Sequence, residues 1–207
     1  MRTFQVNTPK NSVKIECFYN SIGKDEIKVD KQVFCDMCLK GCKNYGKKYS
    51  CPPLSPEFKV LAKNYEGLFV LLFKCGLSQI NSTPYNKVRI ANSMMKSRVD
   101  KLMGLLEDKF NARFLSTGSC RLCKKCNLQS KLPCKHPKEM RFSLEATGVD
   151  CDFLSKKLFN LPLLWFRDGN APDYTCCVTG LLCNSKDTPQ IQREAENLLS
   201  NLFDISL

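Results

Sequence analysis

The chain has 207 residues, of which 43% are hydrophobic and 25% are charged, a composition typical of globular proteins that excludes a disordered chain. A chain of this length can bury a sizeable core without covalent cross-links, so its 14 cysteines need another explanation. The N-terminal residues lack the apolar stretch of a signal peptide, and no apolar run is long enough to cross a bilayer. We therefore expect a cytoplasmic protein whose reduced thiols bind metal, rather than a secreted disulfide scaffold.

The charge balance is strongly basic, with a formal net charge of +12. A basic surface suits an acidic partner, such as an acidic redox protein, a partner enzyme or a nucleic acid. No long basic run and no alternation of basic with aromatic residues stands out, so nucleic acid is weakly supported. Dispersed lysines that keep the protein in solution are the alternative explanation, and no membrane partner is expected.

Two short elements are expected around the first group of cysteines. Residues 26–34 alternate between polar and apolar side chains and predict a short strand. Ser55, Pro56 and Glu57 have the pattern of a helix start, with a cap, a proline in the first turn and an acidic residue. That helix is expected to end near Tyr65.

The middle of the chain has the clearest periodicity. A continuous apolar run at residues 68–73 predicts a buried strand. Apolar residues recur every three or four positions from Val88 to Phe110 and predict an amphipathic helix, and residues 112–117 predict a second strand. This strand–helix–strand order predicts a parallel pair with a right-handed crossover.

The last third predicts several shorter elements. In chain order they are helical sequence after Pro137 to Ala146, a helix at 152–159, a strand-like segment at 161–166, a turn at 168–169, a strand at 174–182 and an amphipathic helix at 191–203. Together the elements predict one α+β or α/β domain spanning residues 1–207. We expect a small mixed sheet with a β-helix-β crossover, flanking helices and two cysteine-rich metal-binding loops.

Eight cysteines fall in two runs, which are the proposed metal ligands: Cys35, Cys38, Cys42 and Cys51 in residues 35–51, and Cys120, Cys123, Cys126 and Cys134 in residues 120–134. In each run three cysteines stand two or three residues apart and the fourth lies further along. Three closely spaced thiolates can wrap one face of a 4Fe–4S cluster from a single loop. A four-cysteine zinc site usually consists of two separated pairs, so the spacing favours iron–sulfur clusters, with zinc as the alternative.

The other candidate residues have simpler interpretations. Cys75 and Cys151 are expected to be small buried residues. Cys176 and Cys177 are adjacent on a predicted strand, so they should point to opposite faces. Packing is the simpler interpretation of these two and of Cys183, and the alternative is that one of them lines a cluster site or carries sulfur. His136 could tune or bind the second centre, although a surface turn histidine is the simpler interpretation, and solvated carboxylates are the default for Glu145 and Asp150. Basic residues surround the second run, and each could stabilise thiolates, dock an acidic partner or simply be solvated: Arg121, Lys124, Lys125, Lys131 and Lys135.

Two blocks of this sequence resemble a known family. They are Cys35-Asp-Met-Cys-Leu-Lys-Gly-Cys42 leading to Tyr49-Ser-Cys-Pro-Pro53, and Cys120-Arg-Leu-Cys-Lys-Lys-Cys126 with Cys134-Lys-His-Pro137 and Arg141-Phe-Ser-Leu-Glu-Ala-Thr-Gly-Val-Asp150. These blocks are similar to the predicted metal-binding proteins grouped as domain of unknown function 2284, which are frequent in anaerobic bacteria and methanogens. The resemblance covers roughly residues 30 to 185 and implies bound metal, with iron–sulfur as the expected form, but no reaction. Phe142 stands where proline is common in the family, and Cys151 where an aliphatic residue is common.

Three functional hypotheses follow from these observations. The first is an electron-transfer protein with two 4Fe–4S clusters, which acts with a partner enzyme. The second is a cluster-dependent enzyme in which one iron stays open and sulfur is transferred, as in thiolation or desulfuration, with the distant fourth cysteine of a run left free. The third is a structural zinc module that binds nucleic acid. The sequence contains no catalytic triad or phosphate-binding glycine loop, and it identifies no catalytic residue.

Overall fold

The computed structural model describes residues 1–7 and 12–203. Its five strands form one sheet in the order β1-β2-β3-β5-β4. The strands are β1 (Arg2–Asn7), β2 (Ser12–Gly23), β3 (Gly67–Gly76), β4 (Arg113–Leu115) and β5 (Tyr174–Cys183). The α-helices of the described residues are α1 (Lys31–Gly41), α2 (Phe58–Leu61), α3 (Pro84–Lys109), α4 (Cys151–Phe159) and α5 (Thr188–Phe203). The α+β class is therefore confirmed.

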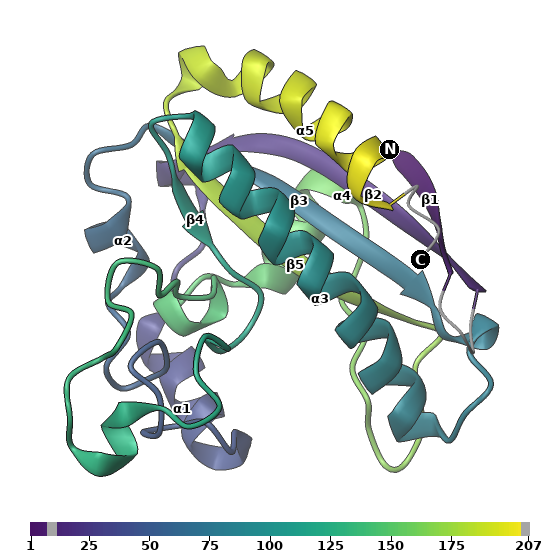
Figure 1. Ribbon diagram of the computed structural model, residues 1–207, viewed down its shortest axis with the longest axis horizontal. Helices are drawn as coiled ribbons and strands as arrows, with labels where there is room; N and C mark the ends of the chain where they lie inside the picture. Colours follow the sequence, from purple (N-terminus) through teal and green to yellow (C-terminus); the bar gives the residue numbers. More distant parts are fainter. Residues whose placement is uncertain (8–11, 204–207) are drawn as a thin grey trace.

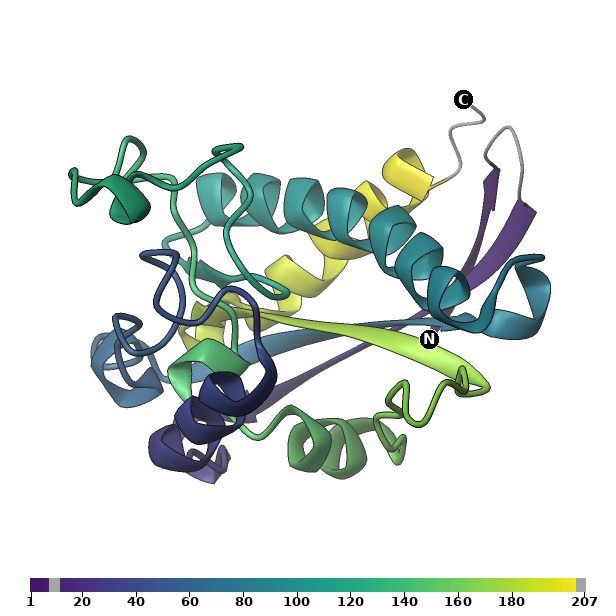
Figure 2. The ribbon, with the colours of Figure 1, turned by 90° about the horizontal axis from the view of Figure 1, so that it is seen from below.

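The sheet is covered on both faces (Figures 1 and 2). Helices α3 and α5 lie on one face, while α4 and the chain around α1 lie on the other. Along β3, Phe69, Leu71 and Phe73 belong to the core shared with α3 and α5, whereas Leu68 and Leu72 belong to the core on the opposite face. Burial on both faces explains why this strand is a continuous apolar run.

Most of the periodic segments form the predicted elements. The strands expected at 68–73, 112–117 and 174–182 correspond to β3, β4 and β5. The helices expected from Val88 to Phe110, at 152–159 and at 191–203 correspond to α3, α4 and α5. The turn at 168–169 is also confirmed, since Asp168 and Gly169 both have positive φ, 49° and 78°, as a tight turn of primed type requires.

The expected parallel pair and mixed sheet are corrected by the strand pairing. Strands β3 and β4 flank α3 in the sequence and run in the same direction, but β5 lies between them and pairs with both. All neighbouring strand pairs of the described sheet are consequently antiparallel. The arrangement is a split β-helix-β unit, in which a later strand fills the gap left by the crossover.

Four local predictions are wrong. Residues 31–34 of the strand expected at 26–34 are helical, because the Asp30 carboxylate accepts a hydrogen bond from Val33 N at 3.0 Å and caps α1. The helix expected from Ser55 to Tyr65 is much shorter than predicted, because only α2 forms there and it begins after Glu57. Only the 3-10 turn Glu145–Thr147 forms in the segment after Pro137, and residues 161–166 are not a strand.

The short length of β4 leaves an opening in the sheet. β4 pairs with β5 only from Arg113 to Leu115, opposite Gly180 to Leu182. Beyond Leu115 the chain turns away, and Ser116 N donates a hydrogen bond to Phe142 O at 2.8 Å. The first half of β5 therefore has β3 on one side and no strand partner on the other among the described residues. None of the described helices has the length and apolarity that crossing a bilayer requires.

Candidate metal centres

The first cysteine run starts in a helix and returns through a tight loop. Cys35 and Cys38 lie in α1, and Cys42 caps it through a hydrogen bond from Cys42 N to Cys38 O at 2.9 Å. The chain then folds back, as Gly46 N donates to Pro52 O at 2.9 Å. The return places Cys51 beside the end of α1, where its side chain is buried.

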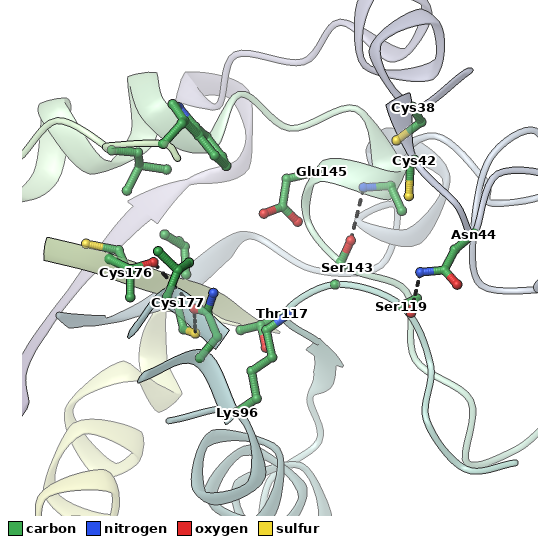
Figure 3. A pocket seen from close by; sticks show the side chains of 18 of the residues that line it. Cys38, Cys42, Asn44, Lys96, Thr117, Ser119, Ser143, Glu145, Cys176 and Cys177 are labelled. Atoms are coloured by element: carbon green, nitrogen blue, oxygen red, sulfur yellow. Dashed lines mark hydrogen bonds between the residues drawn. The ribbon is translucent and has the colours of Figure 1, made fainter. Parts of the chain in front are cut away.

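Three thiols of this run line one cavity. Cys38, Cys42 and Cys51 face a cavity of about 540 Å³, and Figure 3 shows Cys38 and Cys42 at one end of it. Burial raises the pKa of Cys38, with further increases from the neighbouring Cys42 and Cys51. Cys35 does not line the cavity, and its sulfur lies 3.9 Å from the Tyr45 hydroxyl. Cys35 thus differs from the other three thiols of the run in not facing the cavity.

The second run lies in an irregular loop that closes on itself. Asn127 starts a 3-10 turn, Asn127–Ser130, and its side-chain amide donates to Pro133 O at 2.9 Å. This closure helps to place all the cysteines of the run around one small hollow, together with His136 and Tyr49. The hollow is lined by Cys120, Cys123, Cys126 and Cys134. The structure therefore brings the four thiols of the second run to one hollow.

The two runs are joined by hydrogen bonds. Cys120 N donates to Ser50 Oγ at 3.0 Å, and Lys48 Nζ donates to Cys120 O at 2.6 Å. The Tyr49 hydroxyl donates to Leu132 O at 2.8 Å, further along the second loop. Burial raises the pKa of the Cys51 thiol, and smaller increases come from Cys42 of the first run and Cys120 of the second. The two candidate centres are therefore immediate neighbours.

The donor chemistry suits a soft metal centre. All 14 cysteines are free, and thiolates are the ligands that iron–sulfur clusters and zinc share. Among residues 1–7 and 12–203, no three Cys, His, Asp or Glu side chains are arranged to hold a metal ion.

Charged residues near the second run fall into two groups. Arg121 is paired with Asp100, and His136 lines the hollow while its Nδ1 lies 2.8 Å from Glu139 Oε2. The remaining basic residues are exposed and make no ion pair within the described part of the chain: Lys124, Lys125, Lys131 and Lys135.

The cysteines outside the two runs are buried or half-buried. Cys75 and Cys151 are in the core, which confirms their packing role. Cys177 packs on the α3 face of the sheet and Cys176 on the other, as their adjacent positions in β5 require. Burial raises the pKa of Cys176 and of Cys177 to about 12, so both thiols stay protonated at neutral pH.

Comparison with known proteins identifies the family of this chain. Residues 20–183 match the family described as predicted metal-binding protein, domain of unknown function 2284. The chain belongs to this family. The match includes both cysteine runs and most of the sheet. No curated protein and no solved structure gives a significant match.

The cavity contains charged residues that sequence reasoning did not identify as functional. Glu145 was expected to be solvated, but its Oε2 atom is buried and has no hydrogen-bond partner. Asp150, in contrast, caps α4 by accepting from Phe153 N at 3.0 Å and pairs with Lys28. Lys96 faces the same cavity from α3. Lys96 lies beside the apolar stripe of α3 and is half-buried, and the sequence offered no signal for it, because only the packing shows which side of α3 meets the cavity.

Proposed function

We propose that this protein holds two iron–sulfur clusters, one at each cysteine run, and transfers electrons to or from a partner enzyme. The observation that carries the proposal is the contact between the runs, in which Ser50 binds the Cys120 amide. Such clusters supply one-electron redox chemistry when bound. Two centres in contact loops provide a short route for an electron through the protein.

Each centre has a defined set of candidate ligands. The residues that would hold the second cluster all line one hollow: Cys120, Cys123, Cys126 and Cys134. The residues that would hold the first cluster are Cys35, Cys38, Cys42 and Cys51. Lys48 lies between the two sets and donates to Cys120 O, so a cation is present where two anionic centres would lie close together.

The charge of the molecule supports an acidic partner. The chain carries a net charge of +12, and exposed lysines at 124, 125, 131 and 135 surround the second hollow. A basic surface around a redox centre attracts an acidic protein and orients its approach. The second run is therefore the proposed docking side.

Metal analysis after anaerobic purification tests the proposal. We expect about eight iron and eight sulfide per chain, as two 4Fe–4S clusters require. Cys134→Ser should remove about half of the iron, whereas the matched Cys183→Ala, in a buried thiol outside both runs, should keep it. A colourless, zinc-loaded protein would refute both the electron-transfer and the cluster-enzyme functions and leave the structural zinc module.

One observation favours the cluster-dependent enzyme as a second candidate. Cys38, Cys42 and Cys51 line the 540 Å³ cavity and Cys35 does not. A centre held by these three thiols would keep an open position toward a substrate in the cavity, as sulfur transfer requires. The cysteine that stands apart is thus the first of the run rather than the distant fourth.

Cys35→Ser separates the two candidates. If the first cluster has four cysteine ligands, iron content and the redox signal of that centre should both fall. Retained iron with an unchanged redox signal favours the three-ligand enzyme. Cys51→Ser is the comparison variant, because both candidates require that thiol.

A further inference from the structure

A cavity of about 540 Å³ lies where the sheet is open (Figure 3). It forms because β4 ends at Leu115 and leaves the first half of β5 without a strand on that side. Its walls are the first cysteine run, α3, the start of β5, the 3-10 turn Glu145–Thr147 and the loop after α4. This volume falls in the range of small-molecule sites.

One wall presents a carboxylate, that of Glu145, which interacts with the buried Cys151 thiol but has one oxygen without a hydrogen-bond partner. Glu145 projects into the cavity in Figure 3, and its Oε2 atom is buried with no hydrogen-bond partner. The backbone beside it is held firmly, since Ala146 N donates to Ser143 Oγ at 3.2 Å and Ala146 O accepts from Ser55 Oγ at 2.6 Å. A buried carboxylate oxygen without a donor is destabilising. A ligand donor at this position would remove that penalty.

The opposite wall presents an ammonium group without a partner. Lys96 makes no hydrogen bond or ion pair within the described residues, and it lines the same cavity. A Cβ atom at Gly118 would lie 2.9 Å from Lys96 Nζ, so this glycine leaves room for the ammonium. Thr117 Oγ1, also in the cavity wall, is buried without a hydrogen-bond partner. This side is suited to an anionic group.

Another part of the cavity lining is apolar. Trp165 and Phe166 line the cavity from the loop after α4, together with Leu163. Trp165 is 57% exposed although it is the only tryptophan of the chain. The loop is anchored, because Leu163 N donates to Asp152 Oδ1 at 2.8 Å and the hydroxyl of Tyr174 donates to Pro162 O at 2.6 Å. An exposed aromatic side chain on an anchored loop can cover the apolar body of a ligand.

From this arrangement we propose that the cavity binds a small organic zwitterion. Its anionic group pairs with Lys96, its amino group pairs with Glu145, and its apolar part lies against Trp165 and Phe166. A ligand with only one charge leaves either the carboxylate or the ammonium unpaired, and a neutral ligand leaves both. This inference goes beyond electron transfer and does not depend on which metal the cysteines bind.

Calorimetry with matched probes tests the inference on the metal-loaded protein. The zwitterionic probes are L-phenylalanine and glycyl-L-phenylalanine, which carry their charges at a short and a longer separation. The single-charge controls are 3-phenylpropionate and 2-phenylethylamine, which share the phenyl group. We expect at least one zwitterion to bind about tenfold or more tightly than both controls.

Variants assign each charge to its partner. Lys96→Gln should weaken zwitterion binding about tenfold or more while leaving 2-phenylethylamine unchanged, and Glu145→Gln should do the same while leaving 3-phenylpropionate unchanged. Lys101→Gln and Asp108→Asn, both exposed on α3, should leave every probe unchanged.

Three outcomes overturn the inference. They are no binding of either zwitterion at millimolar concentration, equal binding of zwitterions and single-charge probes, and a loss of iron in Glu145→Gln, which would make that carboxylate a metal ligand. Metal content is measured on the same samples. A metal-free preparation would refute the proposed function, whereas a metal-loaded protein that does not bind zwitterions would refute only the ligand site.

Discussion

The buried hydroxyl of Ser50 accepts a hydrogen bond from the backbone amide of Cys120 at 3.0 Å, and so joins the two cysteine runs. Ser50 precedes the last cysteine of the first run, and Cys120 is the first cysteine of the second. The residues are far apart in the chain, so this contact makes the two candidate centres neighbours. We therefore expect a change in one loop to affect the other.

Ser50→Ala should destabilise the protein and weaken the second centre. The substitution leaves the Cys120 N–H without its partner in a half-buried position, and we expect the free energy of unfolding to fall by about 1–2 kcal/mol. Anaerobic urea unfolding measures this change, and metal analysis measures occupancy. Ser93→Ala, at an exposed position of α3, is the control. Equal stability and equal metal content in the two variants would contradict the role assigned to Ser50.

Arg141→Ala should be more destabilising. Arg141 Nε donates to both carboxylate oxygens of Glu107, at 2.9 and 2.8 Å, and thereby ties the segment after the second run to α3. Their side chains are only 18% and 10% exposed. Removing the cation leaves a largely buried carboxylate whose remaining contacts are Phe114 N at 3.0 Å and the longer Arg113 pair at 3.8 Å. We expect a loss of about 2–4 kcal/mol in the free energy of unfolding.

The geometry of this pair provides its control. Arg141→Lys keeps the charge but loses the paired contacts of the guanidinium. Its free energy of unfolding should therefore lie between those of the wild type and Arg141→Ala. Lys135→Ala, exposed in the same region, should change stability little. A lysine variant as unstable as the alanine variant would show that charge at this position contributes nothing.

The buried thiol of Cys177 should make the protein less stable at high pH. Burial raises the pKa of Cys177 from 9.0 to about 12 in the folded state. Above pH 9 the unfolded chain ionises this thiol while the folded chain keeps it protonated, so the unfolded state binds fewer protons. The free energy of unfolding therefore falls as pH rises from about 9 toward 12, by at most about 1.4 kcal/mol per pH unit for this group.

Urea unfolding at several values between pH 8 and 11, with reductant present, measures this dependence. Other groups titrate in the same range, so the informative quantity is the difference between the wild type and Cys177→Ala. The stability of the variant should decline less steeply above pH 9. Parallel curves would mean that the thiol ionises equally in both states.

Charge reversal around the second run should slow electron exchange with an acidic partner. The quadruple variant changes Lys124, Lys125, Lys131 and Lys135 to Glu. We expect the rate of reduction by an acidic ferredoxin to fall about tenfold or more at low salt, and its salt dependence to weaken. Stopped-flow absorbance under anaerobic conditions measures both quantities.

The control for this experiment has the same net charge. It changes Lys59, Lys63, Lys101 and Lys186, which are exposed outside the second run, to Glu. A general effect of charge would slow both variants equally, and that result would contradict docking at the second run.

The local sequence pattern was sufficient to predict the elements whose apolar residues recur with a clear period. The continuous apolar run became β3 and the three-or-four spacing became α3 because in both cases burial follows directly from the pattern. The short strand expected at 26–34 failed because the Asp30 cap favours a helix, although α1 has no buried residue to show a helical stripe. In β2, the alternation of Val13, Ile15 and Cys17 toward the core was a usable signal that the sequence interpretation missed.

The sequence by itself determined the chemistry of the donors and the family. Eight cysteines in two runs are visible as spacing, and spacing within a loop is a local property. Only the tertiary structure decided that the runs touch, that Cys35 stands apart from the cavity and that Glu145 and Lys96 face it. These relationships arise because β5 inserts between β3 and β4, and because the short β4 leaves one end of β5 open. Pairing between distant strands depends on the packing of the whole sheet, which no local pattern contains.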